Sequence, residues 1–379
     1  MKILLTGGGT GGHITPILAV AHEIKKLQND AVLTYVGERN AKFKELTLNC
    51  GDFDSRFYIF AGKFRRYHND SWYSRVFDVK TNLLNVRDSL YVLMGIFQAL
   101  WLLIRKRPDI IFIKGGFVAV PIGLVARILK IPYITHDSDV IPGLTNRIIG
   151  KGAQLNTTGM PTQYYAYPTN KVRQVGIPLD SYYVKVDQTI KNKYREKLNI
   201  PIDREVLFVT GGSQGAKNIN TAVSVIANNL LTERKNLYII HQVGQADSNV
   251  YGSFSSERLV VKKFIDEMYL YSGAADVVVS RASMTTIAEL GVQSKPVIII
   301  PHPYLSDGHQ LKNAELIKSI GGGSVLQESE IENNPQILAD EIKHLLDNRT
   351  IANKYAKNLN EIIMPNSARM IAKMLLENK

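Results

Sequence analysis

Residues 2–16 read KILLTGGGTGGHITP, a short apolar run followed by five glycines within six positions. Apolar residues then recur at helical spacing from Ile17 to Leu27. The stretch predicts a buried strand, a glycine-rich turn and a helix, the opening unit of an α/β fold. Glycine lets backbone N–H groups approach a ligand closely, and the helix N-terminus adds partial positive charge. We expect this turn to bind phosphate, or to stabilise negative charge that develops on an oxygen atom.

The second half of the chain repeats this pattern. Residues 205–218 read EVLFVTGGSQGAKN, so TGG at 210–212 occupies the same place in its unit as TGG at 6–8. Apolar, β-branched runs alternate with helical patterns, which predicts parallel sheets covered by helices on both faces. We therefore expect two doubly wound, Rossmann-like domains that join near GIPLDSYY at 176–183. The predicted strands are 3–6, 31–36, 56–60, 109–114 and 132–135, then 205–210, 237–244, 258–264, 276–280 and 295–301.

The composition is that of a globular, cytosolic chain. The 379 residues are 45% hydrophobic and 21% charged, and this length favours two domains. The single cysteine, Cys50, excludes an internal disulfide framework, and the N-terminus has no secretory pattern. The net charge of +12 indicates an anionic partner. Charge alone leaves open whether that partner is nucleic acid, anionic lipid or a phosphate-rich substrate.

Gly7, Gly9 and Gly12 also satisfy G-x-G-x-x-G, the dinucleotide fingerprint. Glu38, at the end of the second predicted strand, supplies the acidic residue that an NAD site needs. A dehydrogenase nevertheless leaves the second glycine loop and His13 without a role. The dipole of the predicted helix favours a neutral imidazole at His13, which suits a general base. The alternative is a histidine that merely caps the helix.

Polar side chains follow several predicted strands, where open α/β sheets bind their ligands. Asp137 and Asp139 lie in THDSDVIPGLTNRIIG (135–150) and resemble the D-x-D pair of metal-dependent sugar transferases. Two carboxylates alone make a poor magnesium site, so we expect the pair to cap the PGLTN turn and to face a cleft.

Two further helix starts carry candidate ligand contacts. In SRASMTTIAELG (280–291), Glu289 can accept hydrogen bonds from a ribose diol, or can be an ordinary solvated glutamate. His309, Gln310 and Asn313 cluster at the start of the next predicted helix. We expect the polar residues after these strands to point into one cleft.

Residues 62–80 interleave basic and aromatic side chains, and an apolar run, LYVLMGIFQALWLLI, follows at 90–104. The run is shorter than the roughly 20 residues that span a bilayer, so one interpretation is a buried core helix. The other is a membrane-facing edge, where each basic side chain near anionic headgroups contributes about 1 kcal/mol. RNA binding would use the same residues, but the segment has no nucleic-acid motif. The predicted membrane-facing residues are Lys63, Arg65, Arg66, Trp72, Phe97, Trp101 and Arg105.

Six stretches occur in the order in which the MurG family has them: GGGTGGHITP, KGGFVAVP, HDSDVIPGLTNR, GGSQGAKNIN, SRASMTTIAE and SDGHQLKNAE. The chain resembles this family nearly from end to end. The resemblance implies the GT-B glycosyltransferase fold, two Rossmann-like domains facing a cleft. The acceptor domain would be 1–175, to which the last helix (366–379) returns, and the donor domain 176–365. The implied reaction is inverting transfer of N-acetylglucosamine from UDP-GlcNAc to the 4-hydroxyl of the muramyl sugar of lipid I, which forms lipid II for peptidoglycan and cell-wall synthesis.

The resemblance also implies roles for individual residues and partners. His13 is the first candidate for the general base and Asp139 the second, while Ser213 resembles the α-phosphate contact and Glu289 the ribose contact. The implied partners are UDP-GlcNAc, undecaprenyl-linked lipid I and an anionic membrane surface at the cytoplasmic face of the cell membrane, with no metal, cofactor or nucleic acid. The implied UDP-GlcNAc contacts are Thr10, Gly11, Gly12, Asp139, Ser213, Ile265, Met284, Thr285, Thr286, Ile287, Ala288, Glu289, His309 and Gln310.

Two residues depart from the family pattern. Asp180 in GIPLD stands where the family has an arginine that helps to bind the nucleotide sugar, and Asp137 stands in place of a glutamate. Because an aspartate repels a diphosphate, we expect Arg173 or Arg281 to substitute for that arginine. Two alternatives share the implied fold: a glycosyltransferase with another lipid or sugar acceptor, and a UDP-GlcNAc 2-epimerase, which needs no apolar, basic edge.

Overall fold

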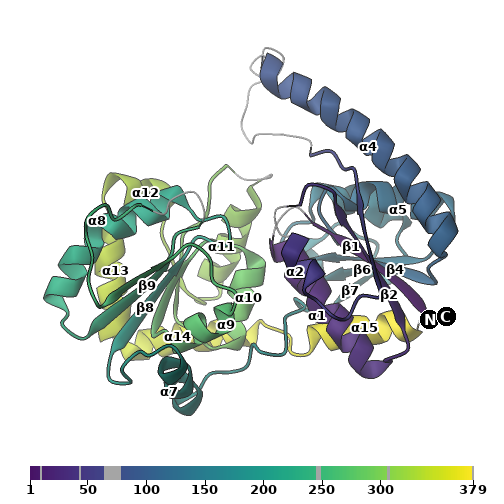
Figure 1. Cartoon of the computed structure of the whole chain (residues 1–379). Helices are drawn as coiled ribbons and strands as arrows, with labels where there is room; N and C mark the ends of the chain where they lie inside the picture. Colours follow the sequence, from purple (N-terminus) through teal and green to yellow (C-terminus); the bar gives the residue numbers. More distant parts are fainter. Residues whose placement is uncertain (9–10, 42–43, 64–77, 245–248, 305–307, 378–379) are drawn as a thin grey trace. The chain divides into compact units, whose positions relative to one another are not determined.

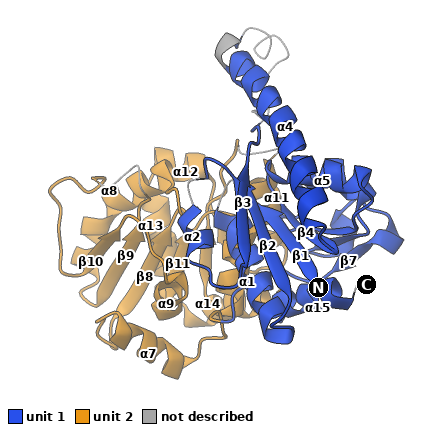
Figure 2. Ribbon diagram, turned by 45° about the vertical axis from the view of Figure 1, so that its right-hand side comes forward, with its two compact units in different colours: residues 1–181, 364–379 blue, residues 182–363 orange. Residues whose placement is uncertain are grey.

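The computed structural model describes residues 1–8, 11–41, 44–63, 78–244, 249–304 and 308–377. The chain divides into two compact units (Figures 1 and 2). Unit 1 holds Met1–Ser181 and Met364–Lys379, and unit 2 holds Tyr182–Ile363. Each unit contains one parallel sheet, which confirms the predicted α/β class.

Unit 1 is built on a seven-stranded sheet in the order β3-β2-β1-β4-β5-β6-β7. Its inner strands read as continuous apolar runs because helices cover both faces of the sheet. The strands are β1 (Lys2–Gly7), β2 (Val32–Glu38), β3 (Ser55–Ile59), β4 (Ile110–Gly115), β5 (Tyr133–Asp137), β6 (Leu155–Thr158) and β7 (Val172–Gln174). The helices are α1 (Gly11–Leu27), α2 (Lys44–Leu48), α4 (Val79–Lys106), α5 (Ala119–Ile128), α6 (Leu144–Ile149) and α15 (Ser367–Glu377).

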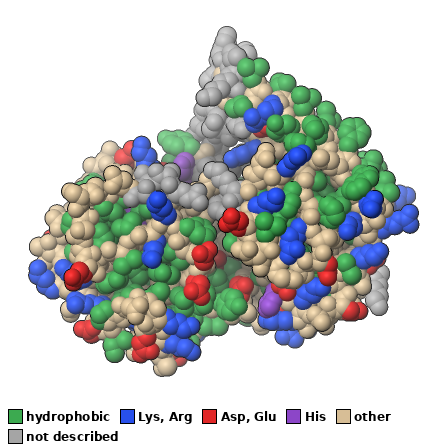
Figure 3. Space-filling model, in the orientation of Figure 1, with side chains coloured by type: hydrophobic (Ala, Val, Ile, Leu, Met, Phe, Trp, Pro, Cys, Tyr) green, Lys and Arg blue, Asp and Glu red, His purple; other side chains and the backbone are tan. Residues whose placement is uncertain are grey.

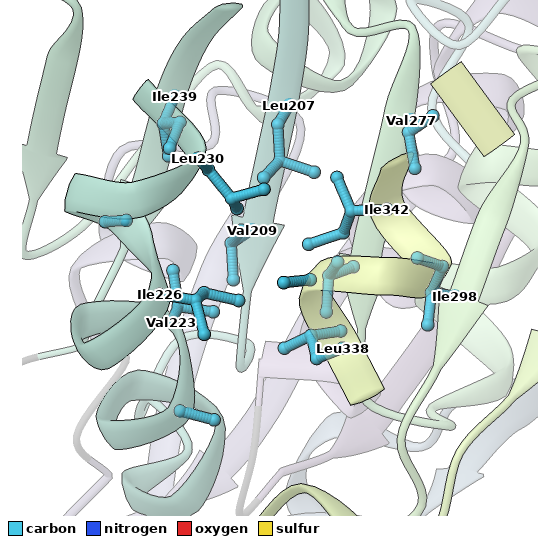
Figure 4. Packing of buried hydrophobic residues seen from close by; sticks show 14 of the residues in the cluster. Leu207, Val209, Val223, Ile226, Leu230, Ile239, Val277, Ile298, Leu338 and Ile342 are labelled. Carbon is cyan, nitrogen blue, oxygen red and sulfur yellow. The ribbon is translucent and has the colours of Figure 1, made fainter. Parts of the chain in front are cut away.

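Unit 2 has a six-stranded parallel sheet in the order β10-β9-β8-β11-β12-β13. Aliphatic side chains of β8, β11 and β12 interlock with those of α8 and α13 in a fully buried core (Figure 4). The strands are β8 (Glu205–Thr210), β9 (Leu237–Gln242), β10 (Leu259–Lys262), β11 (Val277–Ser280), β12 (Val297–Ile299) and β13 (Ser324–Val325). The helices are α7 (Gln188–Lys197), α8 (Lys217–Glu233), α9 (Met268–Ala274), α10 (Met284–Val292), α11 (His309–Ser319), α12 (Glu328–Asn333), α13 (Gln336–Asp347) and α14 (Arg349–Glu361).

The last helix, α15, belongs to unit 1 although it follows unit 2 in the chain. Ile371 and Leu375 of α15 are fully buried in one core cluster with Ile17 and Ile24 of α1. The chain thus crosses between the units twice, once after Ser181 and once before Met364.

The apolar run at 90–104 is the second half of α4, a helix of 28 residues that begins at an Asp78 cap. Its inner face is buried on unit 1, where Ala99, Leu102 and Leu103 join the core. Its opposite face is exposed, and the Phe97 side chain is 71% exposed. The segment is therefore core on one face and surface on the other, so the buried-core interpretation describes only its inner face.

Candidate active site

In unit 2, the second glycine loop follows β8 and leads into α8. Gly215 has φ +80°, and a Cβ atom there would collide with the carbonyl oxygen of Val243. A Cβ atom at Gly244, where φ is +83°, would likewise collide with the backbone of Gln214. Only glycine allows these two loops to lie against each other, which brings their backbone amides to the carboxyl end of the sheet.

Three helices of unit 2 begin at this same edge. Helices α8, α10 and α11 follow β8, β11 and β12, which are adjacent strands of one parallel sheet. Their N-cap residues, Ala216, Ser283 and Gly308, make no side-chain cap hydrogen bond. The first N–H groups of a helix have no partner within the helix, so three converging starts of this kind favour an anion.

The predicted donor contacts differ in which atoms they can offer. Ser213 lies partly exposed in the β8–α8 loop, and Thr286 and His309 are partly exposed at helix starts. Met284, Ile287 and Ala288 are fully buried, so these three residues cannot present their side chains to a ligand. Ile287 also donates its N–H to Ser283 within the helix, at 2.9 Å. Ile265 is likewise buried, in the segment after β10.

Glu289 is the ionisable residue of α10, one turn beyond the start of the helix. Burial raises the pKa of Glu289 to about 8, although a hydrogen bond from the Tyr183 hydroxyl opposes this shift. The carboxyl group is therefore largely protonated at neutral pH. A ligand that donates hydrogen bonds to it would stabilise the ionised form.

The surrounding side chains hold the helix starts together. Asn313 of α11 is fully buried and donates to the carbonyl of Ala282 at 2.9 Å, which ties α11 to the start of α10. The Gln310 side chain accepts from the N–H of His302 at 2.9 Å. Arg281 is buried and forms an ion pair with Glu328. The structure therefore gives Arg281 a structural role, which argues against its proposed use as a substitute arginine.

In unit 1, the first glycine loop lies against the loop that follows β4. A Cβ atom at Gly116, where φ is +81°, would collide with the carbonyl of Gly8. The Thr145 hydroxyl donates to the carbonyl of Gly116 at 3.1 Å and so ties the start of α6 to this loop. Gly11, Gly12 and His13 form the first turn of α1 and are partly exposed.

Asp137 is the last residue of β5 and Asp139 lies two residues beyond it, at the same sheet edge as the first glycine loop. Asp137 is buried and accepts hydrogen bonds from the Tyr167 hydroxyl at 2.7 Å and the Gly143 N–H at 3.2 Å. The expected cap on the PGLTN turn is thus present at Asp137. Asp139 is partly exposed, and its backbone carbonyl accepts from the Tyr165 hydroxyl at 2.7 Å.

Lys114 of β4, which precedes Gly115 and Gly116, is a buried basic residue that the sequence motifs do not single out. Burial lowers the pKa of its ammonium group, and the charges of Asp139 and Asp137 act in the opposite direction. The motif KGG at 114–116 was the available signal, but it does not reveal which carboxylates the lysine faces. This edge of unit 1 thus combines one lysine with two aspartates.

Four of the predicted site residues cannot be placed in the structure. Thr10, Arg65, Arg66 and Trp72 lie outside the described residues, as does Gly9 of the fingerprint. Within the described ranges, no group of three or more His, Cys, Asp or Glu side chains is placed to hold a metal ion.

Comparison with protein families decides the class of this site. The glycosyltransferase family 28 N-terminal domain matches residues 3–155, and the family's C-terminal domain matches 206–372. The chain belongs to glycosyltransferase family 28. It is therefore a glycosyltransferase, and the NAD-dehydrogenase interpretation of the first glycine loop is wrong.

Two relatives of this family 28 chain carry the same enzyme name. A Clostridium perfringens protein named UDP-N-acetylglucosamine--N-acetylmuramyl-(pentapeptide) pyrophosphoryl-undecaprenol N-acetylglucosamine transferase is 34% identical over 92% of this chain and 91% of its own length. A Natranaerobius thermophilus protein of the same name is 30% identical over 99% of both chains. These relatives confirm the resemblance to the MurG family.

Solved structures confirm the GT-B fold of this family 28 chain. The crystal structure of Acinetobacter baumannii MurG matches with a TM-score of 0.69, 21% identity and 99% coverage of both chains. A UDP-GlcNAc 2-epimerase from Neisseria meningitidis, bound to UDP-GlcNAc, matches with a TM-score of 0.68 and 13% identity over 100% of both. At such identities the likeness shows the fold alone, which transferases and epimerases share.

Proposed function

We propose that this enzyme transfers N-acetylglucosamine from UDP-GlcNAc to the 4-hydroxyl of the muramyl sugar of lipid I, with inversion, to form lipid II. Three helix starts at one sheet edge of unit 2 carry this proposal, together with the family membership of the chain. Their backbone N–H groups can stabilise the charge that develops on the leaving diphosphate, which is the role a metal plays in other transferases.

The donor contacts we propose lie in unit 2. The first turn of α10, Met284 to Thr286, would offer backbone N–H groups to phosphate, and the Glu289 carboxylate would accept from the ribose hydroxyls. Ser213 would contact the α-phosphate, and Ile265 would contact uracil through its backbone because its side chain is buried. Thr285, His309 and Gln310 complete the proposed donor contacts, and Ile287 and Ala288 would support them from the core.

The acceptor side of the reaction is assigned to unit 1. The attacking hydroxyl must lose a proton, and His13 at the start of α1 is our first candidate for the base. Asp139 is the second candidate, because its carboxylate is partly exposed at the same sheet edge as the first glycine loop. Gly11 and Gly12 would contact the substrates through their backbone N–H groups.

The exposed face of α4 supports a peripheral position at the membrane surface. Figure 3 shows hydrophobic side chains (green) along α4, with lysine and arginine side chains (blue) beside them. The Arg105 guanidinium lies over the Trp101 ring at 5.2 Å, so that one basic and one aromatic group share the end of this face. Such a surface binds anionic membranes through apolar burial and charge. Its exposed large apolar residues are Leu83, Val86, Leu90, Leu93, Met94, Phe97, Trp101 and Ile104.

Helix α4 is long and apolar enough to cross a bilayer by length and composition, because Thr81–Lys106 spans 26 residues. Its inner face, however, packs tightly on unit 1, and a Cβ atom at Gly95 would collide with the carbonyl of Phe60. We therefore infer that α4 lies in the interface with its outer face toward lipid, at the cytoplasmic face where lipid I would be met.

Radiolabelled UDP-GlcNAc incubated with lipid I tests the proposed function. We expect the label to enter the lipid phase in a 1:1 ratio with released UDP. Label that stays in the aqueous phase while UDP-ManNAc or its products appear would favour the epimerase. Transfer to another lipid, with none to lipid I, would favour a related glycosyltransferase.

A further inference from the structure

A cavity of about 220 Å³, open to solvent, lies at the surface of unit 1, and its lining includes Phe117, the residue after Gly116 of the loop that packs on the first glycine loop. It opens where β2 and β3 end, and α4 closes one side of it. Its polar lining includes three cations, Arg39, Lys63 and Arg87, and two carboxylates, Glu38 and Asp88. The volume equals that of about seven waters, which is room for a phosphoryl or pyrophosphoryl group. The proposed transfer mechanism assigns no role to this cavity.

The walls of the cavity are fixed by close backbone contacts. A Cβ atom at Gly62 would collide with the carbonyl of Asp88, and one at Gly95 with the carbonyl of Phe60. The Phe60 N–H also donates to the Gln98 side chain at 2.8 Å. The segment after β3 is therefore held against α4 at three points, which fixes the backbone of the cavity, while the side chains of Arg39, Lys63 and Arg87 are exposed to solvent.

Aromatic rings position two of the three cations. The Arg39 guanidinium lies 4.8 Å from the centre of the Phe60 ring, and the Arg87 guanidinium 5.4 Å from that of Tyr91. The two rings stack on each other, with centroids 5.4 Å apart. A guanidinium held on an aromatic face loses little further freedom when it binds an anion, and its planar N–H groups match phosphate oxygens.

The carboxylates reduce the positive charge of the cavity but do not cancel it. Asp88 is buried and accepts from Nε and Nη2 of Arg87, at 3.0 and 2.9 Å, so it holds this arginine in place. Burial raises the pKa of Glu38, which makes this carboxyl easier to neutralise. With both carboxylates ionised, the three cations still leave a net charge of +1.

The cavity borders the exposed apolar face of α4. Arg87 and Tyr91 line it, while their chain neighbours Val86 and Leu90 are 62% and 56% exposed on that face. A free phosphate would use only the cations. A phosphoryl group attached to a hydrocarbon chain would use both the cations and the apolar face.

We propose that this cavity binds the phosphoryl group of a lipid whose hydrocarbon chain lies along the outer face of α4. The inference rests on the proposed function in one respect, namely that the substrate of this enzyme is presented by a membrane. The lipid can be the isoprenoid pyrophosphate of the acceptor or a bulk anionic phospholipid, since both offer the same chemistry.

Isothermal titration of the full chain, without sugar nucleotide, tests this assignment with three probes. The probes are farnesyl pyrophosphate, a short-chain phosphatidylglycerol below its micelle concentration, and inorganic pyrophosphate. We expect at least one of the two lipids to bind at least tenfold more tightly than inorganic pyrophosphate. Preference for farnesyl pyrophosphate would identify the acceptor as the source, and preference for phosphatidylglycerol the bilayer. Equal binding of all three probes, or binding of none, would overturn the proposal.

Variants separate the cavity from general surface charge. Arg39→Gln and Lys63→Gln should each weaken lipid binding about tenfold, because a charge-assisted hydrogen bond is lost. Lys151→Gln removes the same charge from an exposed site elsewhere on unit 1 and should change binding less than twofold. Leu90→Gln should weaken binding of the lipid but leave inorganic pyrophosphate unchanged.

Unchanged lipid binding in Arg39→Gln and Lys63→Gln, or an equal loss in Lys151→Gln, would refute the cavity as the site. Because these titrations contain no UDP-GlcNAc, that result would leave the transfer reaction itself untouched. Conversely, a chain that binds the lipid through this cavity but transfers no label would contradict the proposed function and not the cavity.

Discussion

Binding of UDP should release a proton from Glu289. Burial raises the pKa of this carboxyl to about 8, so about 0.9 of the molecules carry the proton at pH 7. If the ribose hydroxyls donate to the carboxylate, the bound form is ionised and the proton leaves. Binding at pH 7 should therefore release up to about 0.9 proton per UDP, and affinity should rise about fivefold between pH 7 and pH 8.

Glu289→Gln is the matched variant because it keeps the size and hydrogen-bonding capacity of the side chain but cannot ionise. Calorimetric titration of UDP in two buffers of different ionisation enthalpy gives the number of protons released. The difference between wild type and variant isolates Glu289 from the ionisation of UDP itself. Equal proton release in the two proteins would refute the assignment of Glu289 to the ribose.

The same carboxyl makes the stability of the fold depend on pH. Its folded-state pKa lies above the ordinary value of 4.5, so the unfolded chain ionises first as pH rises. Wild type should therefore lose stability relative to Glu289→Gln between about pH 5 and pH 8, by at most about 1.4 kcal/mol per pH unit. Urea unfolding at a series of pH values measures this, and parallel curves for the two proteins would contradict the raised pKa of Glu289.

Three further predictions test other parts of the structure. Gly215→Ala should lower the free energy of unfolding by more than about 1 kcal/mol and weaken UDP binding. The backbone at this position has φ +80°, and the added Cβ atom would collide with the Val243 carbonyl. An unchanged urea midpoint and an unchanged UDP affinity would contradict the tight loop contact. Arg281→Gln should lower the free energy of unfolding in urea by about 3–5 kcal/mol, since it leaves Glu328 buried without its partner. A loss of UDP affinity without destabilisation would instead indicate that Arg281 contacts the nucleotide. Phe97→Asp should reduce flotation with anionic vesicles while leaving the free energy of unfolding within about 0.5 kcal/mol of wild type, because the side chain is exposed. A large destabilisation would instead indicate a buried helix face.

Much of the fold follows from local patterns in the sequence. The apolar runs before each TGG are β1 and β8, and the amphipathic pattern from Ile17 to Leu27 lies in α1. These elements are predictable because a buried parallel strand and a one-sided helix each leave a distinct hydrophobic period. The sequence does not predict where α4 begins. The first turns of this helix, from Asp78 to Asp88, mix polar and apolar residues and are ordered by the Asp78 cap and by packing.

Contacts between distant residues account for what the sequence leaves undetermined in the site. Tyr167 binds Asp137 across 30 residues, and Arg281 meets Glu328 across 47. No spacing rule links such pairs, because the fold alone brings them together. The run from Met284 to Glu289 was predicted as one binding segment, whereas the helical period turns Ile287 into the core and keeps Glu289 at the edge.

The central claim is that backbone amides at the helix starts of unit 2 hold the diphosphate of the sugar nucleotide. A crystal structure of the chain with UDP-GlcNAc bound tests it most directly. We expect diphosphate oxygens within about 3 Å of the N–H groups in the β8–α8 loop and the first turn of α10. A diphosphate bound only by lysine and arginine side chains, with those amides left to water, would contradict the account.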